Sequence, residues 1–401
     1  MSIGIRALRS AGAATIALAT VGALALGTAG SATADTGPTD PAANTAIDLP
    51  LPPGAVLSDP AAVNDKGVIV GYVTDPTNHD LPVRWDADLT PTALPLLPGD
   101  GDGRAVAVSD DGSAVGYSGN HTVRWAPDGT VSVLPLLPSD TAGWGYIYAI
   151  SRTGTAVGHS AAGQASHAVK WGPDGRAVPL AALSGDVNST AVSVNSSGAV
   201  AGLSYSASGV AHPVKWAPDG TPTALDPTSA YQDVWVVQIN DAGTVLGKAT
   251  PTGAANDQWR SLTWNTDGTV TDLGRHSTAM ALNATGTVVG QQGGADNIDY
   301  TATSWSPDGT ATTIGADYDY TTAVAVNDAG LSVGYTGTKV PSAQERHALR
   351  WAPDGTLTEL NEAPGSYSYP VAVNNPGLTV GVRITYPTPT SPTRTAVIWR
   401  P

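Results

Sequence analysis

The sequence contains no cysteine and no phenylalanine, and charged residues make up only 13% of it. Without cysteine no disulfide can form, so the fold must be held by buried apolar surface. Only one long apolar run is present, Ala13–Gly27. It is shorter than the roughly 18 residues that a membrane span needs, and it is followed by Ala32-Thr33-Ala34, the pattern of a signal-peptidase site. We therefore predict a signal peptide over residues 1–34 rather than a membrane anchor, and a secreted, extracellular protein.

Basic residues are scarce. The chain has 19 Lys and Arg against 34 Asp and Glu, a formal net charge of −15. Removal of residues 1–34 takes away Arg6 and Arg9 and no acidic residue, so the exported chain is more acidic still. Phosphate binding depends on clusters of Lys and Arg, which excludes nucleic acid as the expected partner. The sequence has no second apolar run that would predict a membrane span.

What the sequence has in abundance is an internal repeat, written eight times. Each copy starts with Asn or Ser, at Asn64, Ser109, Ser151, Asn195, Asn240, Asn283, Asn327 and Asn374. A first glycine follows three residues later in every copy, and a second glycine follows four residues after the first. A tryptophan completes each copy: Trp85, Trp125, Trp171, Trp216, Trp264, Trp305, Trp351 and Trp399, spaced by 40–48 residues.

Each repeat predicts four short antiparallel strands. The Asn-x-x-Gly segment lies between alternating apolar residues and is typical of a hairpin turn, because Asn caps its own turn and Gly accepts a positive φ. The Pro-Asp-Gly segment that follows most of the tryptophans predicts a second hairpin. Four strands every 40–50 residues are typical of a β-propeller blade. The sequence therefore predicts an all-β, eight-bladed propeller.

The two ends of the repeat array predict how the ring closes. The eighth copy ends at Trp399-Arg400-Pro401, without an outer strand, while the segment Ala46–Pro52 precedes the first copy without belonging to it. Leu49 precedes Asn64 by the same fifteen residues by which Leu94 precedes Ser109. We predict that Ala46–Pro52 completes the last blade, which removes two open sheet edges. The expected organisation is a flexible leader over 35–45 and one propeller over 46–401.

Some copies also resemble a known repeat. The segments HAVKW (residues 167–171) and HALRW (residues 347–351), after Asn-x-x-Gly-x-x-Val-Gly, resemble the extracellular HAF repeat, named for its His-Ala-Phe core. The resemblance spans about residues 46–401, with Val or Leu in the Phe position. It implies a secreted β-propeller-like repeat protein and no particular activity.

The propeller places the candidate ligand site on one face. Connections between second and third strands, and between outer strands and the next blade, vary in length and share a face, and binding residues concentrate on such loops. Aromatic rings and carboxylates lie there, as a sugar requires. The candidate ligand-binding residues are Trp144, Tyr146, Tyr231, Trp235, Asp257, Trp259, Asp317, Tyr318, Asp319, Tyr320, Tyr367 and Tyr369. The alternative is that these rings only plug the channel or pack between blades.

Metal and enzyme signatures are weak. The histidines four residues before tryptophan belong to different blades, so we expect structural hydrogen bonds to a neighbouring blade and no shared metal: His121, His167, His212 and His347. The Asp-rich segments 99–103 and 317–319 lack the run of oxygen ligands of a calcium loop, so tight turns are expected and no cofactor, although calcium stays an alternative. Gly-x-Ser-x-Gly occurs only at residues 330–334, inside a copy of the repeat, and His-Glu-x-x-His does not occur.

These observations favour a secreted, non-catalytic binding protein whose partner is a surface carbohydrate or an extracellular protein. Two alternatives stay open. One is a carbohydrate-active hydrolase or lyase with a carboxylate pair at the channel mouth. The other is a propeller subunit of a larger secreted assembly, whose aromatic residues would form a protein interface.

Overall fold

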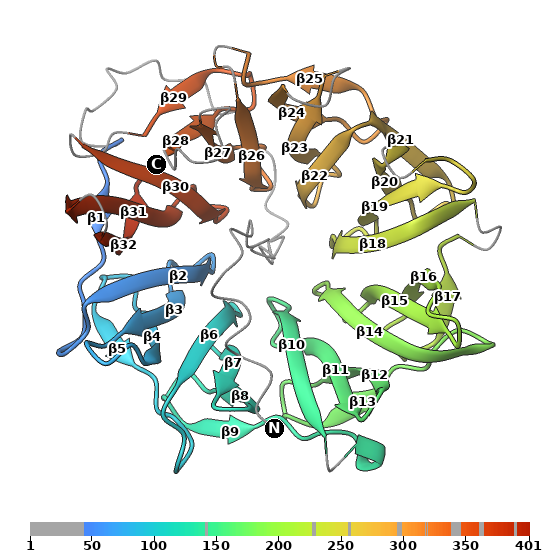
Figure 1. Ribbon diagram of the computed structural model, residues 1–401, viewed down its shortest axis with the longest axis horizontal. Coiled ribbons are helices and arrows are strands. Elements are labelled where there is room, and N and C mark those ends of the chain that lie inside the picture. Colours follow the sequence, from blue (N-terminus) through green and yellow to red (C-terminus); the bar gives the residue numbers. More distant parts are fainter. Residues whose placement is uncertain are drawn as a thin grey trace, which may run out of the picture.

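A computed structural model describes residues 44–140, 143–226, 230–255, 258–294, 299–316, 318, 320–337, 346–360, 365–388 and 391–401. The predicted signal peptide and nearly all of the leader lie outside these residues and stay predictions. The strands β1–β32 form eight four-stranded antiparallel sheets arranged in a ring (Figure 1). The predicted all-β, eight-bladed propeller is confirmed. No helix in the described part of the chain is long and apolar enough to cross a membrane.

Each blade is built from an inner, a second, a third and an outer strand. The inner strands are β2 (Leu57–Val63), β6 (Gly103–Val108), β10 (Trp144–Ile150), β14 (Asp186–Val194), β18 (Tyr231–Ile239), β22 (Ser277–Leu282), β26 (Thr321–Val326) and β30 (Ser366–Val373). The second strands are β3 (Ile69–Thr74), β7 (Ala114–Ser118), β11 (Ala156–Ala162), β15 (Val200–Ser206), β19 (Val245–Pro251), β23 (Val288–Gly293), β27 (Ser332–Gly337) and β31 (Thr379–Thr388). Blades 1–8 are numbered in this order.

The third strands all end at the repeat tryptophan: β4 (Asp80–Trp85), β8 (His121–Trp125), β12 (Ala165–Trp171), β16 (Ala211–Trp216), β20 (Arg260–Trp264), β24 (Tyr300–Trp305), β28 (Arg346–Trp351) and β32 (Ser391–Trp399). The outer strands are β5 (Pro91–Ala93), β9 (Val131–Val133), β13 (Ala177–Pro179), β17 (Pro222–Ala224), β21 (Val270–Arg275), β25 (Ala311–Thr313), β29 (Leu357–Glu359) and, in blade 8, β1 (Ile47–Asp48). A short 3₁₀ turn, η2 (Pro138–Asp140), lies between blades 2 and 3.

The ring closes through strand β1, as the sequence predicts. Ile47 pairs with Ile398 in the antiparallel sheet of blade 8, and the Leu49 N–H donates to the carbonyl of Ala396 at 2.8 Å. The Leu49 side chain then packs into the apolar cluster between blades 8 and 1, which includes Trp85. In addition, the Trp85 indole N–H donates to the Pro50 carbonyl at 2.8 Å. The closing segment therefore joins the last blade to the first.

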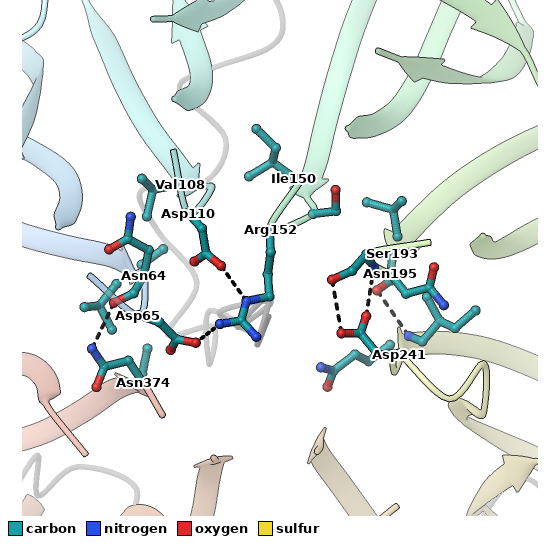
Figure 2. A pocket seen from close by; sticks show the side chains of 18 of the residues that line it. Asn64, Asp65, Val108, Asp110, Ile150, Arg152, Ser193, Asn195, Asp241 and Asn374 are labelled. Atoms are coloured by element: carbon teal, nitrogen blue, oxygen red, sulfur yellow. Dashed lines mark hydrogen bonds and ion pairs between the residues drawn. The ribbon is translucent and has the colours of Figure 1, made fainter. Parts of the chain in front are cut away.

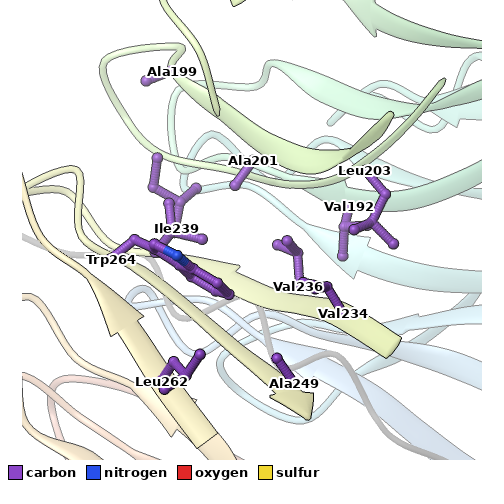
Figure 3. Packing of buried hydrophobic residues seen from close by; sticks show 11 residues of the cluster. Val192, Ala199, Ala201, Leu203, Val234, Val236, Ile239, Ala249, Leu262 and Trp264 are labelled. Carbon is purple, nitrogen blue, oxygen red and sulfur yellow. The ribbon is translucent and has the colours of Figure 1, made fainter. Parts of the chain in front are cut away.

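The core is divided among the blade interfaces. Figure 3 shows the interface of blades 4 and 5, where Val192 and Leu203 face Val236 and Trp264. The eight repeat tryptophans are all buried, and each packs into an apolar cluster of this kind. A tryptophan buries about 150–250 Å², which corresponds to roughly 4–6 kcal/mol of transfer free energy before the cost of ordering. The tryptophan repeat thus stabilises the stacking of one blade on the next.

The repeat asparagines cap the first hairpin, as predicted, and also link the blades. The Asn64 side-chain oxygen accepts the Val68 N–H at 2.9 Å, and its amide donates to the Ser109 carbonyl of blade 2 at 2.8 Å. The same side-chain hydrogen bond, from an asparagine amide to the carbonyl of the next repeat asparagine, joins blades 4 to 5, 5 to 6, 6 to 7 and 7 to 8. It also joins blade 8 to Asn64 of blade 1. Serine replaces asparagine in blades 2 and 3, so these two blades lack the amide donor.

The second glycine of each repeat is required for a reason that could not be predicted from the sequence. All eight inner strands contain a bulge opposite it. In blade 2 the bulge lies between Ala105 and Ala107 and presses the inner strand toward Gly116, so that a Cβ there would lie 2.0 Å from the Arg104 carbonyl oxygen. Close backbone approach, and no positive φ, requires this glycine. The first glycines do adopt positive φ, +89° at Gly112 for example, as predicted.

The two faces of the ring differ as predicted. Inner and second strands are joined by five-residue turns in every blade, such as 64–68 and 327–331, and third and outer strands by five-residue turns such as 86–90. We call this side the constant face. The other connections range from the single residue His276, between β21 and β22, to the ten residues 134–143 between β9 and β10. They share the opposite side, the variable face.

Candidate functional site

At the variable-face end of the inner strands, charged and aromatic side chains from five consecutive blades form a row. Most neighbours in the row are joined by side-chain contacts, whereas Arg104 and Tyr117 are paired through the backbones of β6 and β7. We call this set the mouth arc. In order from blade 7 to blade 3, it consists of Arg346, Tyr335, Tyr369, Arg394, Asp59, Tyr72, Arg104, Tyr117, Tyr146, His159 and Trp144.

The first part of the arc joins arginines to tyrosines across blades 7 and 8. The Arg346 guanidinium lies 4.7 Å from the ring centroid of Tyr335 and 5.3 Å from that of Tyr369. The two tyrosine rings are 6.4 Å apart. Arg394 donates to the Tyr369 hydroxyl at 3.1 Å. Cation–π contacts of this kind hold a guanidinium without neutralising it.

The middle of the arc is a charged cluster at the junction of blades 8, 1 and 2. Arg394 forms an ion pair with the buried Asp59, which also accepts a hydrogen bond from the Tyr72 hydroxyl. Arg104 lies 4.4 Å from the Tyr72 ring centroid and donates through Nε to the buried Asp80 at 3.0 Å. Burial raises the pKa of Asp59, and it raises the pKa of Tyr72 to about 12.

The last part of the arc is an aromatic shelf in blades 2 and 3. The Tyr117 hydroxyl donates to the Ile147 carbonyl at 3.0 Å, and its ring centroid is 5.6 Å from that of Tyr146. Tyr146 stacks on His159 with 8° between the planes and 5.7 Å between centroids. Trp144 meets the edge of the same imidazole at 5.2 Å. Trp144 is 50% exposed and Tyr146 42% exposed, so both rings can contact a ligand.

His159 is buried beneath this shelf. It is 8% exposed, and its Nδ1 has no hydrogen-bond partner among the described residues. Burial lowers the pKa of His159 to about 4. The imidazole is therefore neutral at pH 7 and supports the rings above it.

The buried imidazole predicts a pH dependence of stability. The pKa of His159 is about 4 in the folded state, against an ordinary value of 6.5. Between these values only the unfolded chain takes up the proton, so this stability is complete above pH 6.5 and is lost as the pH falls toward 4. At about 1.4 kcal/mol per pKa unit, the loss is roughly 3 kcal/mol. We expect His159→Gln to remove this part of the slope, and the exposed His79→Gln to keep it, in urea unfolding at pH 7 and 4.5. Equal slopes in the His159→Gln variant and the parent protein would contradict the prediction.

The predicted site residues do not all belong to one site. Trp144, Tyr146 and Tyr369 lie in the mouth arc. Tyr320 adjoins the arc at Tyr335 and Arg346, and on its other side it contacts Tyr300 of blade 6, at 6.1 Å between ring centroids, and Gln291. Tyr367 lies between His347 and Tyr386, and Tyr318 donates to Glu359 of the outer strand of blade 7. Asp257, Asp317 and Asp319 lie outside the described residues.

The predicted residues of blade 5 form a separate group. Tyr231 packs against the core cluster of blades 4 and 5. Trp235 is 67% exposed. Trp259 lies 5.2 Å from the His276 ring, with the Lys248 ammonium 4.7 Å from its own centroid.

Sequence reasoning missed the arginines, Asp59, His159 and the tyrosines Tyr72, Tyr117 and Tyr335. A signal for the tyrosines was present, because the residue directly after the second glycine is Tyr or His in four copies: Tyr72, Tyr117, His159 and Tyr335. No such signal marks the arginines, because blade closure brings Arg394 to Asp59 from the other end of the chain.

Three of the repeat histidines make structural hydrogen bonds, but within their own blade and not to a neighbouring blade as predicted. His167 lies 3.0 Å from Asp140, His212 lies 2.9 Å from Asp186, and His121 lies 3.4 Å from Asp100. Each aspartate precedes or begins the inner strand of the same blade. Asp100 of the GDGDG segment also accepts a hydrogen bond from Ser118 at 2.8 Å. The described residues contain no group of three or more His, Asp or Glu placed to hold a metal ion.

A second space lies on the axis at the constant face (Figure 2). Arg152 of blade 3 reaches into it, donates through Nε to Asp110 of blade 2 at 2.7 Å and forms an ion pair with Asp65 of blade 1. Arg152 thus links blades 1–3, the region in which serine replaces asparagine and the side-chain hydrogen bonds of the repeat asparagines are missing. The remaining cavity is about 30 Å³, which is enough for one or two water molecules. The mouth arc is therefore the better ligand site.

Comparison with known proteins supports the fold and indicates no activity. No protein-family model matches the chain, and no curated protein matches it. Among solved structures, a prolyl endopeptidase matches with a TM-score of 0.53 at 9% identity, over 82% of this chain and 54% of that one. A puromycin hydrolase matches at 0.50 and 14%, over 83% and 59%. Dipeptidyl peptidase 4 of Porphyromonas gingivalis matches at 0.50 and 9%, over 80% and 56%.

The chain therefore spans a little over half the length of these enzymes. At such low identity the likeness carries only the fold.

Proposed function

We propose that this is an exported protein that binds a carbohydrate at the mouth arc without converting it. The observation that carries the proposal is the exposed pair Trp144 and Tyr146, held over His159 on the variable face. Flat apolar rings beside hydroxyl and imidazole groups match the C–H face and the hydroxyls of a sugar. The shelf is rigid because it belongs to strands β10 and β11 and not to a loop.

The ionisable groups of the arc favour binding over catalysis. General acid–base catalysis works best with a pKa near the working pH. Burial moves the pKa of His159 to about 4 and the pKa of Tyr72 to about 12. These groups keep one protonation state at neutral pH, which suits hydrogen bonding to a ligand.

One observation supports the hydrolase or lyase alternative: two buried aspartates, Asp59 and Asp80, flank Tyr72 at the mouth. Each is paired with an arginine, Asp59 with Arg394 and Asp80 with Arg104. The raised pKa of Asp59 is a property of a general acid, but both carboxylates are held by arginines, so we place the enzyme second. Release of reducing ends or unsaturated products from a bound polysaccharide by the protein, lost in Asp59→Asn, would establish it.

The test is glycan-array binding of the purified protein with matched tryptophan variants. We expect Trp144→Ala to weaken binding about tenfold, since aromatic contacts contribute roughly 0.5–1.5 kcal/mol beyond their buried area. Trp235→Ala removes a ring outside the arc that is more exposed than Trp144, 67% against 50%, and should bind like the parent protein. An array without signal, or equal losses in both variants, would refute the proposal; binding only to a protein partner would favour the assembly-subunit alternative.

A further inference from the structure

We infer that the mouth arc selects an acidic polysaccharide, whose uronate carboxylates pair with Arg346. The inference rests on the proposed function and names its ligand class. The arc holds Arg104, Arg346 and Arg394 although the chain has only 19 Lys and Arg against 34 acidic residues. Three guanidinium groups in blades 7, 8 and 2 of an acidic protein indicate a site that can bind a negatively charged ligand.

Two of these arginines are already neutralised. Arg394 pairs with Asp59, and Arg104 with Asp80, and both carboxylates are buried. The Asp80 side chain also accepts a hydrogen bond from Thr74 at 2.9 Å. These pairs fix the arginine side chains in place and balance their charge.

Arg346 differs from the other two. It contacts the rings of Tyr335 and Tyr369, and none of the carboxylates in the described part of the chain forms an ion pair with it. A guanidinium stacked on rings is held by its face, while its N–H groups point outward along its edge. That edge matches a carboxylate with two parallel hydrogen bonds, so Arg346 is the arginine available to a ligand.

The order of the arc suits a chain of sugars. The aromatic shelf of Trp144 and Tyr146 lies at its blade 3 end, and Arg346 lies at its blade 7 end. One sugar stacked on the shelf does not reach across four blade boundaries, whereas a polysaccharide does. The acidic remainder of the protein disfavours indiscriminate attraction of polyanions, so recognition depends on this local cluster.

The experiment compares polygalacturonate and alginate with their carboxyl-reduced forms in titration against the intact exported chain. We expect the acidic forms to bind at least tenfold more tightly. Arg346→Gln should abolish this preference, measured as the ratio of the affinities for the acidic and the reduced forms, and Arg346→Lys should keep part of it. Arg260→Gln, whose partner is Asp272 in blade 5, is the matched control and should keep the full preference.

The outcomes separate the two ideas. If neutral glycans bind and the acidic forms bind no better, or if Arg346→Gln keeps the preference, the inference is wrong and the proposed function stands. If no glycan binds, both fail. Equally tight binding of DNA or polyglutamate would show a response to charge alone and would also overturn the inference.

Discussion

An alanine at Gly116 should destabilise the protein by about 3 kcal/mol or more, at the upper end of the cost of overpacking. The added Cβ would lie 2.0 Å from the Arg104 carbonyl oxygen and 2.9 Å from the Ala105 Cα. Both are backbone atoms of the bulged inner strand, so no side-chain rotation can relieve the clash. The inner strand would have to move away from β7, which breaks the pairing that forms the bulge. Urea unfolding followed by tryptophan fluorescence measures the change.

Two glycines provide controls for this variant. Gly101 has no atom within 4 Å of an added Cβ and no positive φ, so Gly101→Ala should be neutral within about 0.5 kcal/mol. Gly129 is equally open but has φ of +86°, so Gly129→Ala reports the conformational cost alone, about 1 kcal/mol. A loss at Gly116 no greater than that at Gly129 would show that the inner strand yields easily.

Alanine at Leu49 should cost about 2–5 kcal/mol, the range for truncating a buried leucine. Leu49 is 1% exposed and packs between blades 8 and 1. The residues around it, Ile69 and Ile398 among them, come from both ends of the ring and cannot collapse independently into the space. The variant therefore weakens the junction that closes the propeller, and its thermal midpoint should fall accordingly.

Leu51, two residues further on, is the matched control because it is 40% exposed. Leu51→Ala should leave the free energy of unfolding nearly unchanged. Equal stability of the two variants would mean that the closing segment contributes little to the ring. Limited proteolysis adds a second measurement, since only Leu49→Ala should expose the edge of β32 to cleavage.

The architecture could be predicted because its determinants repeat. The tryptophans set the number of blades, and the spacing from Leu49 to Asn64 identified the closing strand. The asparagine turns follow from local chemistry that a single copy contains. The longest-range pairing in the molecule, Ile47 with Ile398, was thus predictable because it reproduces the pairing of every other blade.

The bulge and the charged centre of the arc could not be predicted. A bulge inserts one residue into the alternation of inward and outward side chains. The sequence of an inner strand such as β6 (Gly103–Val108) does not show whether a bulge is present. Arg394 and Asp59, which form an ion pair, occupy positions where the repeat has no common residue. No other copy of the repeat therefore predicts this pair. Among the predicted aromatic residues, only those beside a Tyr or His at the position after the second glycine became part of the arc, as Tyr146 beside His159 shows.

The closing strand also decides when this protein can finish folding. Residue 47 leaves the ribosome first and must wait for residue 398, a delay of roughly 20–70 s at 5–20 residues per second. Until then the nascent chain is an unfinished crescent whose two ends expose apolar surface. A chain that cannot complete its fold early is well suited to crossing a membrane unfolded, as the predicted signal peptide would require.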